Sequence, residues 1–212
     1  AQNKLIVYPN TVRHDFYKDK KVDRDLEKKY SKEFVITYVG NTSKRRGLLT
    51  VIDSLKIIQK TIPNIKLLII GKSSFDQVIK DKIKQNQIEK LVDFIGWIKE
   101  SDIPNYLSIS ELGLSPLHKN IHHDTTYANK VFQYISFGCP IVSSNVIAQS
   151  ELVNKYKIGV IFEDNNAFDL SDKIIELHND KNLYSRLKQN CLDSIEKLNN
   201  SVISNQLISI YE

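Results

Sequence analysis

The sequence predicts an α/β protein with a doubly wound, Rossmann-like parallel sheet, and two observations lead to this fold class. Short continuous apolar runs, typical of strands buried on both faces, alternate with longer stretches whose apolar residues recur at helical spacing. Such alternation favours parallel strands joined by right-handed helical crossovers. The chain has 212 residues, of which 41% are hydrophobic, enough for one large domain or two small ones.

The strands are predicted from the apolar runs, which are too short for buried helices. Each run is followed by polar or glycine-containing sequence that could form a loop. The expected strands, in chain order, are 4–8, 34–39, 66–70, 92–95, 112–116, 141–143 and 160–162.

The helices are predicted from apolar residues that recur every three or four positions. Val51, Leu55 and Ile58 mark one face of the first long helix, and Leu170 and Ile174 mark a later one. The expected helices are 48–58, 75–84, 104–108, 130–137, 148–156, 168–178, 183–198 and 202–211, with a long polar loop over 118–127.

Charge and cysteine content limit the possible partners. The net charge of +5 and a pI near 9.0 fit an anionic ligand, a membrane surface or nucleic acid, but the basic residues form no single tract. Cys139 and Cys191 lack the spacing of a zinc site, so free thiols in a reducing compartment are expected. No apolar run approaches the roughly 20 residues that span a bilayer. The chain contains no methionine, so we expect a fragment or a processed product, and its Ile, Lys and Asn content suggests a bacterial source.

The loops after the strands are where a ligand is expected, because open α/β sheets bind ligands beyond the carboxyl ends of their strands. The loop after 34–39 combines Gly40 and Asn41 with the cations Lys44, Arg45 and Arg46. It matches neither a Walker A pattern nor GxGxxG, which argues against standard NTPase and dinucleotide sites. The alternative is a solvated basic turn.

The segment 129–144 predicts a second anion-binding feature. It reads as a helix, a tight Gly-Cys-Pro turn and a buried strand, with Lys130 in the first turn of the helix. Helix N-termini favour anions, and the upstream segment 124–126 offers hydroxyls and an N-cap. The segment is therefore a candidate diphosphate cradle, and the alternative is an ordinary helix with a solvated lysine.

Several short segments match, in the same order, the motifs of one enzyme family. They are 7–12 (VYPNTV), 38–41 (YVGN) followed by 46–47 (RG), 68–71 (LIIG), 93–96 (DFIG), and 128–142 (ANKVFQYISFGCPIV). These segments resemble the C-terminal, donor-binding half of retaining glycosyltransferases of family 4, the group 1 transferases, which have the GT-B fold. The resemblance runs in register over about residues 5–200.

The resemblance implies where a donor would bind. The implied diphosphate-binding residues are Gly40, Asn41, Lys44, Arg46, Thr126, Asn129 and Lys130, and the implied base- and ribose-binding residues are Trp97, Ile98 and Gln133. Arg46 takes the place of the family's diphosphate-binding lysine, and Asn41 stands where an arginine is usual, so Lys44 or Arg45 could substitute. Gln133 and Thr125 replace the two glutamates of the family's E-x7-E pattern.

The resemblance also implies a function and an organisation. We expect a bacterial, cytoplasmic hexosyltransferase, with peripheral attachment to the inner membrane face as a further expectation and no nucleic-acid partner. It would transfer sugar with retention from a nucleoside-diphosphate sugar to a polysaccharide, lipid-linked or other acceptor. Residues 1–30 would form an interdomain segment and first strand, 31–200 the nucleotide-sugar-binding domain, and 201–212 a C-terminal helix. We expect the N-terminal acceptor domain to be absent from this sequence, so no catalytic residue is assigned and the fragment alone is expected to be inactive.

No cofactor and no metal are expected, because the family needs no metal for the diphosphate. His122, His123 and Asp124 could form a metal or acid/base cluster, but adjacent histidines usually point apart, which disfavours it. Two alternatives stay open. Loss of both glutamates would suit a non-catalytic nucleotide-binding or scaffold domain. A sugar-nucleotide 2-epimerase of the same fold would need acid/base carboxylates that the sequence does not locate.

Overall fold

The structure is a computed structural model that describes residues 11–18 and 23–208, and it describes side chains up to residue 205. The strand predicted at 4–8 lies outside these residues, as does the end of the helix predicted at 202–211. Among the described residues, no helix combines the length and apolar character that crossing a bilayer requires.

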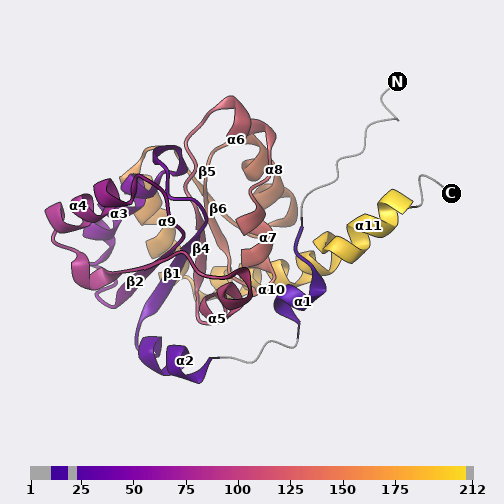
Figure 1. Ribbon diagram of the computed structural model, residues 1–212, viewed down its shortest axis with the longest axis horizontal. Helices are drawn as coiled ribbons and strands as arrows, with labels where there is room; N and C mark the ends of the chain where they lie inside the picture. Colours follow the sequence, from indigo (N-terminus) through magenta and orange to yellow (C-terminus); the bar gives the residue numbers. More distant parts are fainter. Residues whose placement is uncertain (1–10, 19–22, 209–212) are drawn as a thin grey trace.

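The described part of the chain builds one sheet of six parallel strands, which confirms the predicted fold class (Figure 1). The strand order is β3-β2-β1-β4-β5-β6, so the chain winds outward in both directions from the β1–β4 pair. The bounds are β1 Phe34–Val39, β2 Ile65–Ile70, β3 Val92–Gly96, β4 Leu112–Ser115, β5 Ile141–Ser144 and β6 Gly159–Phe162.

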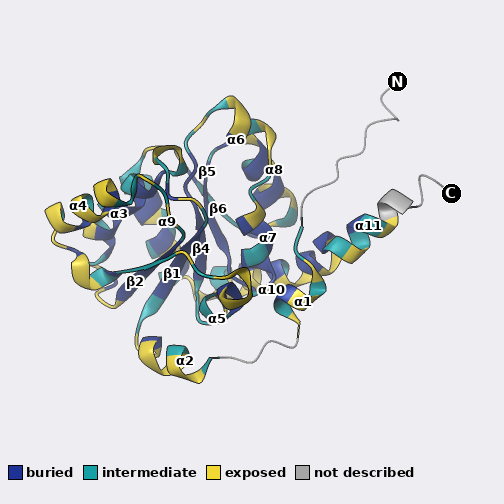
Figure 2. Cartoon of the chain, in the orientation of Figure 1, coloured by how far each residue is buried: buried dark blue, intermediate teal, exposed yellow. Residues whose placement is uncertain are grey.

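Helices cover both faces of the sheet. The core on one face joins the strands to α3, α4 and α9, and the core on the other joins them to α5, α7, α8 and α10 (Figure 1). Figure 2 shows the strands buried between these layers. The helix bounds are α1 His14–Tyr17, α2 Arg24–Tyr30, α3 Leu48–Ile58, α4 Asp76–Gln85, α5 Ile103–Leu107, α6 Ile121–Thr125, α7 Asn129–Ile135, α8 Ile147–Tyr156, α9 Ala167–Asn179, α10 Lys181–Leu198 and α11 Asn200–Ile208. Short 3₁₀ turns occur at η2 Lys44–Arg46, η3 Glu89–Leu91 and η4 Glu100–Asp102.

Three helices form where the sequence analysis expected none, namely α1, α2 and α6, and the last two begin at a capping side chain. In α2, the Asp23 side chain caps the helix by accepting from the backbone N–H groups of Asp25 and Leu26. In α6, inside the predicted polar loop, the Asn120 side chain accepts from the backbone N–H of His123 at 3.0 Å. Both are short helices started by a capping side chain rather than by an apolar face.

The two central strands separate at their carboxyl ends. β1 and β4 are paired only at Ile36–Leu112 and Thr37–Gly113. Beyond this point Tyr134 of α7 lies between them, and its hydroxyl accepts from the backbone N–H of Val39 at 2.9 Å and donates to the carbonyl of Leu114 at 3.0 Å. The sheet therefore opens where its winding direction changes, the point at which such sheets bind ligands.

The ring of Tyr134 requires glycine on β4. A Cβ atom at Gly113 would lie 2.2 Å from the Cγ atom of Tyr134, which is closer than any real contact. The small residue in the strand and the aromatic residue in the helix thus fit together at the opening.

The two cysteines, Cys139 and Cys191, are both free thiols, and both are buried in the core on the same side of the sheet as Tyr134.

Candidate functional site

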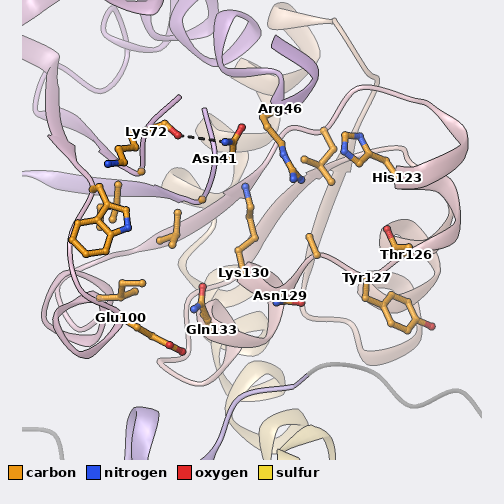
Figure 3. Close-up of a pocket in the computed structure, with 18 of the residues that line it drawn as sticks. Asn41, Arg46, Lys72, Glu100, His123, Thr126, Tyr127, Asn129, Lys130 and Gln133 are labelled. Atoms are coloured by element: carbon orange, nitrogen blue, oxygen red, sulfur yellow. Dashed lines mark hydrogen bonds between the residues drawn. The ribbon is translucent and has the colours of Figure 1, made fainter. Parts of the chain in front are cut away.

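A cavity of about 890 Å³ lies at the carboxyl edge of the sheet, over the gap between β1 and β4. Its walls are the segments after β1, β2, β3 and β4, together with α6 and α7 (Figure 3). This volume is within the range of small-molecule sites. Of the predicted diphosphate residues, the cavity brings together Gly40, Asn41, Arg46, Thr126, Asn129 and Lys130, and of the predicted base and ribose residues it brings together Trp97, Ile98 and Gln133.

Lys130 is the unusual member of this group, because it is a buried lysine. Its side chain is only 6% exposed, and its Nζ atom has no hydrogen-bond partner among the described residues. The Nζ atom lies 3.6 Å from the centroid of the Tyr38 ring and close to the bare backbone of Gly40. Burial, and secondarily the charge of Arg46, holds the pKa of Lys130 well below its usual value.

Arg46 faces Lys130 across the cavity (Figure 3). It is half-buried at the end of the η2 turn, and its buried Nε atom has no hydrogen-bond partner among the described residues. Burial lowers the pKa of the guanidinium. Lys44 and Arg45, in the same turn, are exposed and do not line the cavity. The 3₁₀ turn therefore aims one of three consecutive cations inward and leaves two in solvent.

Two glycines let the ends of β1 and β2 approach each other beside the cations. Gly40 and Gly71 have φ angles of 128° and 140°, and a Cβ atom on Gly71 would lie 1.8 Å from the carbonyl oxygen of Gly40. Asn41 then stabilises its own loop: its side-chain oxygen accepts from the backbone N–H of Ser43 at 2.9 Å, and its amide donates to the carbonyl of Lys72 at 3.4 Å. Bare backbone and a local turn thus form this wall of the cavity.

The expected N-cap upstream of α7 is not formed. The hydroxyl of Thr126 donates back to the carbonyl of His122 at 2.6 Å, and Thr125 likewise donates to Ile121 at 2.7 Å. Ala128 occupies the N-cap position, with no side-chain cap. These threonines end α6 instead of starting α7, because their hydroxyls reach the free carbonyls of the preceding turn.

The opposite end of the cavity is aromatic. Trp97 is 64% exposed just after β3, and the Nζ atom of Lys72 lies 5.6 Å from the centroid of its ring. Ile98 follows in the wall, and Glu100 is the carboxylate among the described lining residues. The amide of Gln133 lies between this end and Lys130. The cavity thus has a cationic end and an end with an exposed aromatic face.

His123 is buried at the cationic end, next to Arg46 (Figure 3). Its Nδ1 atom lies 2.7 Å from the carbonyl oxygen of His118, and its Nε2 atom has no partner among the described residues. Burial lowers the pKa of the imidazole, and the charges of Arg46 and Arg45 act in the same direction.

The sequence analysis disfavoured a metal or acid/base cluster at 122–124, and the described structure does not bring these three side chains together as one. Asp124 accepts from the backbone N–H of Ile147 at 3.1 Å rather than facing His123. Among the described residues, no group of three or more His, Cys, Asp or Glu side chains is placed to hold a metal ion.

The sequence reasoning missed some residues of the site, among them Tyr38 behind the cavity wall, and mentioned others without a role. Tyr38, which stacks under Lys130, was hidden in an apolar strand, and Glu100 had no motif. Lys72 followed a strand-ending glycine, a signal that could have selected it. For His123 the usable signal was Asn120 three residues earlier, which starts the helix that carries it.

The fold and the cavity define a Rossmann-like domain with a cavity lined by Arg46 and Lys130 at the point where the strand order reverses. Comparison with known sequences adds the family: the family described as Glycosyl transferases group 1 matches residues 19–192. The chain therefore belongs to the group 1 glycosyl transferases, and its sheet is the Rossmann-like domain of the GT-B fold.

Individual relatives agree with this assignment. The capsular polysaccharide biosynthesis glycosyltransferase CapM of Staphylococcus aureus is 27% identical over 195 residues, 88% of this chain and 49% of CapM. The crystal structure of Anabaena HepE in complex with UDP is similar at a TM-score of 0.82 and 17% identity, over 95% of this chain and 56% of HepE. The C-terminal domain of the group 1 protein LpcC from Francisella tularensis gives a TM-score of 0.65 at 19% identity, over 90% of this chain and 94% of that domain. The chain thus spans about half the length of CapM.

Proposed function

We propose that this chain is the donor-binding part of a glycosyltransferase and that its cavity binds a nucleoside-diphosphate sugar. The observation that carries the proposal is the buried Nζ atom of Lys130, which has no partner in the described structure and faces the cavity beside Arg46. An uncompensated buried charge costs several kcal/mol. A diphosphate between the two side chains would supply the missing counter-charge and hydrogen-bond acceptors.

The remaining walls suit the rest of a nucleotide sugar. The exposed ring of Trp97 and the neighbouring Ile98 offer a face for the base, and Gln133 lies where a ribose would join base to diphosphate. We propose UDP as the nucleotide, because HepE, of the same fold, is described in complex with UDP. Gly40, Asn41, Thr126 and Asn129 would shape the wall around the phosphates.

The proposed reaction is transfer of a hexose with retention at the anomeric carbon. Lys130 and Arg46 would stabilise the leaving diphosphate as negative charge develops on it. Because a capsular polysaccharide enzyme is among the relatives, we propose a polysaccharide or lipid-linked acceptor, bound by a further domain. On this proposal the present chain binds donor without transferring it, and peripheral attachment to a membrane belongs to the whole protein.

Trp97 provides the test, because it is the sole tryptophan of the sequence. Titration with UDP should change its fluorescence in a saturable way, and a UDP-sugar should compete. ADP and GDP serve as controls for the choice of base. If millimolar UDP, ADP and GDP leave the fluorescence unchanged and give no heat in isothermal titration, the proposed function is wrong.

A further inference from the structure

We propose that His123 is a third anion-binding group of the cavity and that it takes up a proton when a diphosphate binds, which couples donor binding to pH. The inference rests on the proposed function of the same cavity. It assigns a role to a buried side chain that the resemblance does not mention.

The imidazole is held in one orientation by hydrogen bonds at its Nδ1 side. The Nδ1 atom lies 2.7 Å from the carbonyl oxygen of His118 and 2.8 Å from the side-chain amide nitrogen of Asn120. The side-chain oxygen of Asn120 accepts from the backbone N–H of His123 at 3.0 Å. The side chain is 1% exposed, so it has no freedom to turn into solvent. Its Nε2 atom is left without a partner among the described residues, in the wall of the cavity.

The charges around the imidazole oppose protonation while the cavity holds no anion. Arg45 and Arg46 approach it from η2, and His122 from its own helix, with ring centroids 5.5 Å apart. The nearby carboxylates are directed elsewhere: Asp164 accepts from His118, and Asp124 accepts from the start of α8. Lys130 of α7 adds a further cation to the same cavity.

A diphosphate would reverse this balance. We assign to the free protein the neutral tautomer whose Nδ1–H group donates to the carbonyl of His118, which also accepts from the side-chain amide of Asn120 at 2.9 Å. In this tautomer Nε2 carries a lone pair, which cannot donate to a phosphate oxygen. A proton taken from solvent onto Nε2 converts that lone pair into an N–H donor and gives the ring a positive charge. The Nδ1–H bond is kept, so only the Nε2 side changes.

The sign of the pH dependence follows from this change. In the free protein the pKa of His123 is lowered, and the bound anion raises it. Between the free and bound pKa values, binding takes up protons, and affinity falls by up to about tenfold for each unit that the pH rises. Below the free pKa the ring is already charged, and the dependence disappears.

The test is isothermal titration of the whole chain with UDP at neutral pH, in buffers that differ in ionisation enthalpy. The slope of the observed heat against that enthalpy gives the number of protons exchanged. The variant H123N keeps an N–H group that can donate to the carbonyl of His118 but lacks Nε2. His178, which packs on Phe34 away from the cavity, provides the control variant H178N. Proton exchange by UDP itself is common to all three proteins and cancels in the comparison.

We expect wild type and H178N to take up more protons than H123N, and H123N to lose the steep decline of affinity above neutral pH. Equal exchange by all three proteins would overturn the inference, and uptake that persists in H123N would assign the proton to Lys130. Absence of any binding by wild type would instead overturn the proposed function. If H123N does not fold, the ¹⁵N shifts of His123 in wild type decide: they should change from the neutral to the charged pattern when UDP is added, and an unchanged neutral pattern would refute the proposal.

Discussion

Replacing Lys130 with methionine should make the free protein more stable and the ligand complex weaker. Methionine has similar length and no charge, so it can fill the same channel between Tyr38 and Gly40. The opposite signs of the two effects follow from one feature of the structure: the Nζ atom is buried with no partner among the described residues, and it faces a cavity.

The stability gain comes from removing an unsatisfied buried group, which costs about 1–3 kcal/mol. The contact of Nζ with the Tyr38 ring, at 3.6 Å from its centroid, offsets part of that cost. A methionine sulfur makes a contact with an aromatic ring of about 0.3–1.5 kcal/mol, so little of this interaction is lost. We therefore expect the free energy of unfolding to rise by roughly 1–2 kcal/mol.

The loss of affinity comes from removing a charged donor to the diphosphate. Such a hydrogen bond contributes about 1.5–3 kcal/mol, equivalent to roughly a 10- to 150-fold increase in Kd. Urea unfolding without ligand would measure the first effect, and titration of Trp97 fluorescence with UDP would measure the second.

The matched control is Lys66→Met. Lys66 is also largely buried, but it donates to the carbonyl of Lys90 at 2.6 Å and lies 3.5 Å from the carboxylate of Asp93, away from the cavity. Its replacement should destabilise the protein and leave UDP affinity unchanged. If Lys130→Met also lowered stability while leaving Kd unchanged, Lys130 would be a structural residue and the reasoning would be refuted.

The stability difference should depend on pH. The folded pKa of Lys130 lies below its unfolded value of 10.5, so the unfolded chain binds more protons between the two values. Wild-type stability therefore rises with pH through that window. The advantage of Lys130→Met should be largest below the folded pKa and smallest above about pH 10.5, as measured by unfolding at a series of pH values.

Three further substitutions test the site and its frame. Arg46→Ala should raise the Kd for UDP roughly 10- to 100-fold, whereas exposed Lys44→Ala should change it less than about twofold; equal losses would indicate general charge rather than a site. Tyr134→Phe should lower the free energy of unfolding by about 1–3 kcal/mol in urea, because both backbone groups that share its hydroxyl lose a partner; an unchanged midpoint would show that the hydroxyl is not needed. Gln133→Glu should increase the preference for UDP over 2′-deoxy-UDP, since a carboxylate accepts more strongly from two hydroxyls than an amide does; an unchanged ratio of dissociation constants would remove the residue from the ribose site.

Sequence patterns predicted the sheet well, because each buried strand carries its own apolar signal. They failed where a single capping side chain sets the structure, as Asp23 does for α2 and Asn120 does for α6. Helices of this kind have few residues and no apolar stripe, so periodicity cannot reveal them.

The cavity was predictable in location but not in detail. Strand ends and a helix start pointed to one edge of the sheet, and nine of the ten proposed binding residues line the cavity there. Sequence could not tell which of three adjacent cations faces inward, because the η2 turn decides this. Nor could it show that Lys130 is buried, since burial depends on Tyr38, far away in the chain.

The tyrosine between β1 and β4 has a consequence for how a ligand binds. Its hydroxyl replaces the strand pairing that would otherwise close the sheet, so the crevice is already open in the free protein. A nucleotide that enters has no strands to separate, and none of its binding free energy is lost to such a rearrangement. Association of a nucleotide with this cavity should therefore proceed at a rate independent of sheet breathing, and any slow step should arise outside the sheet.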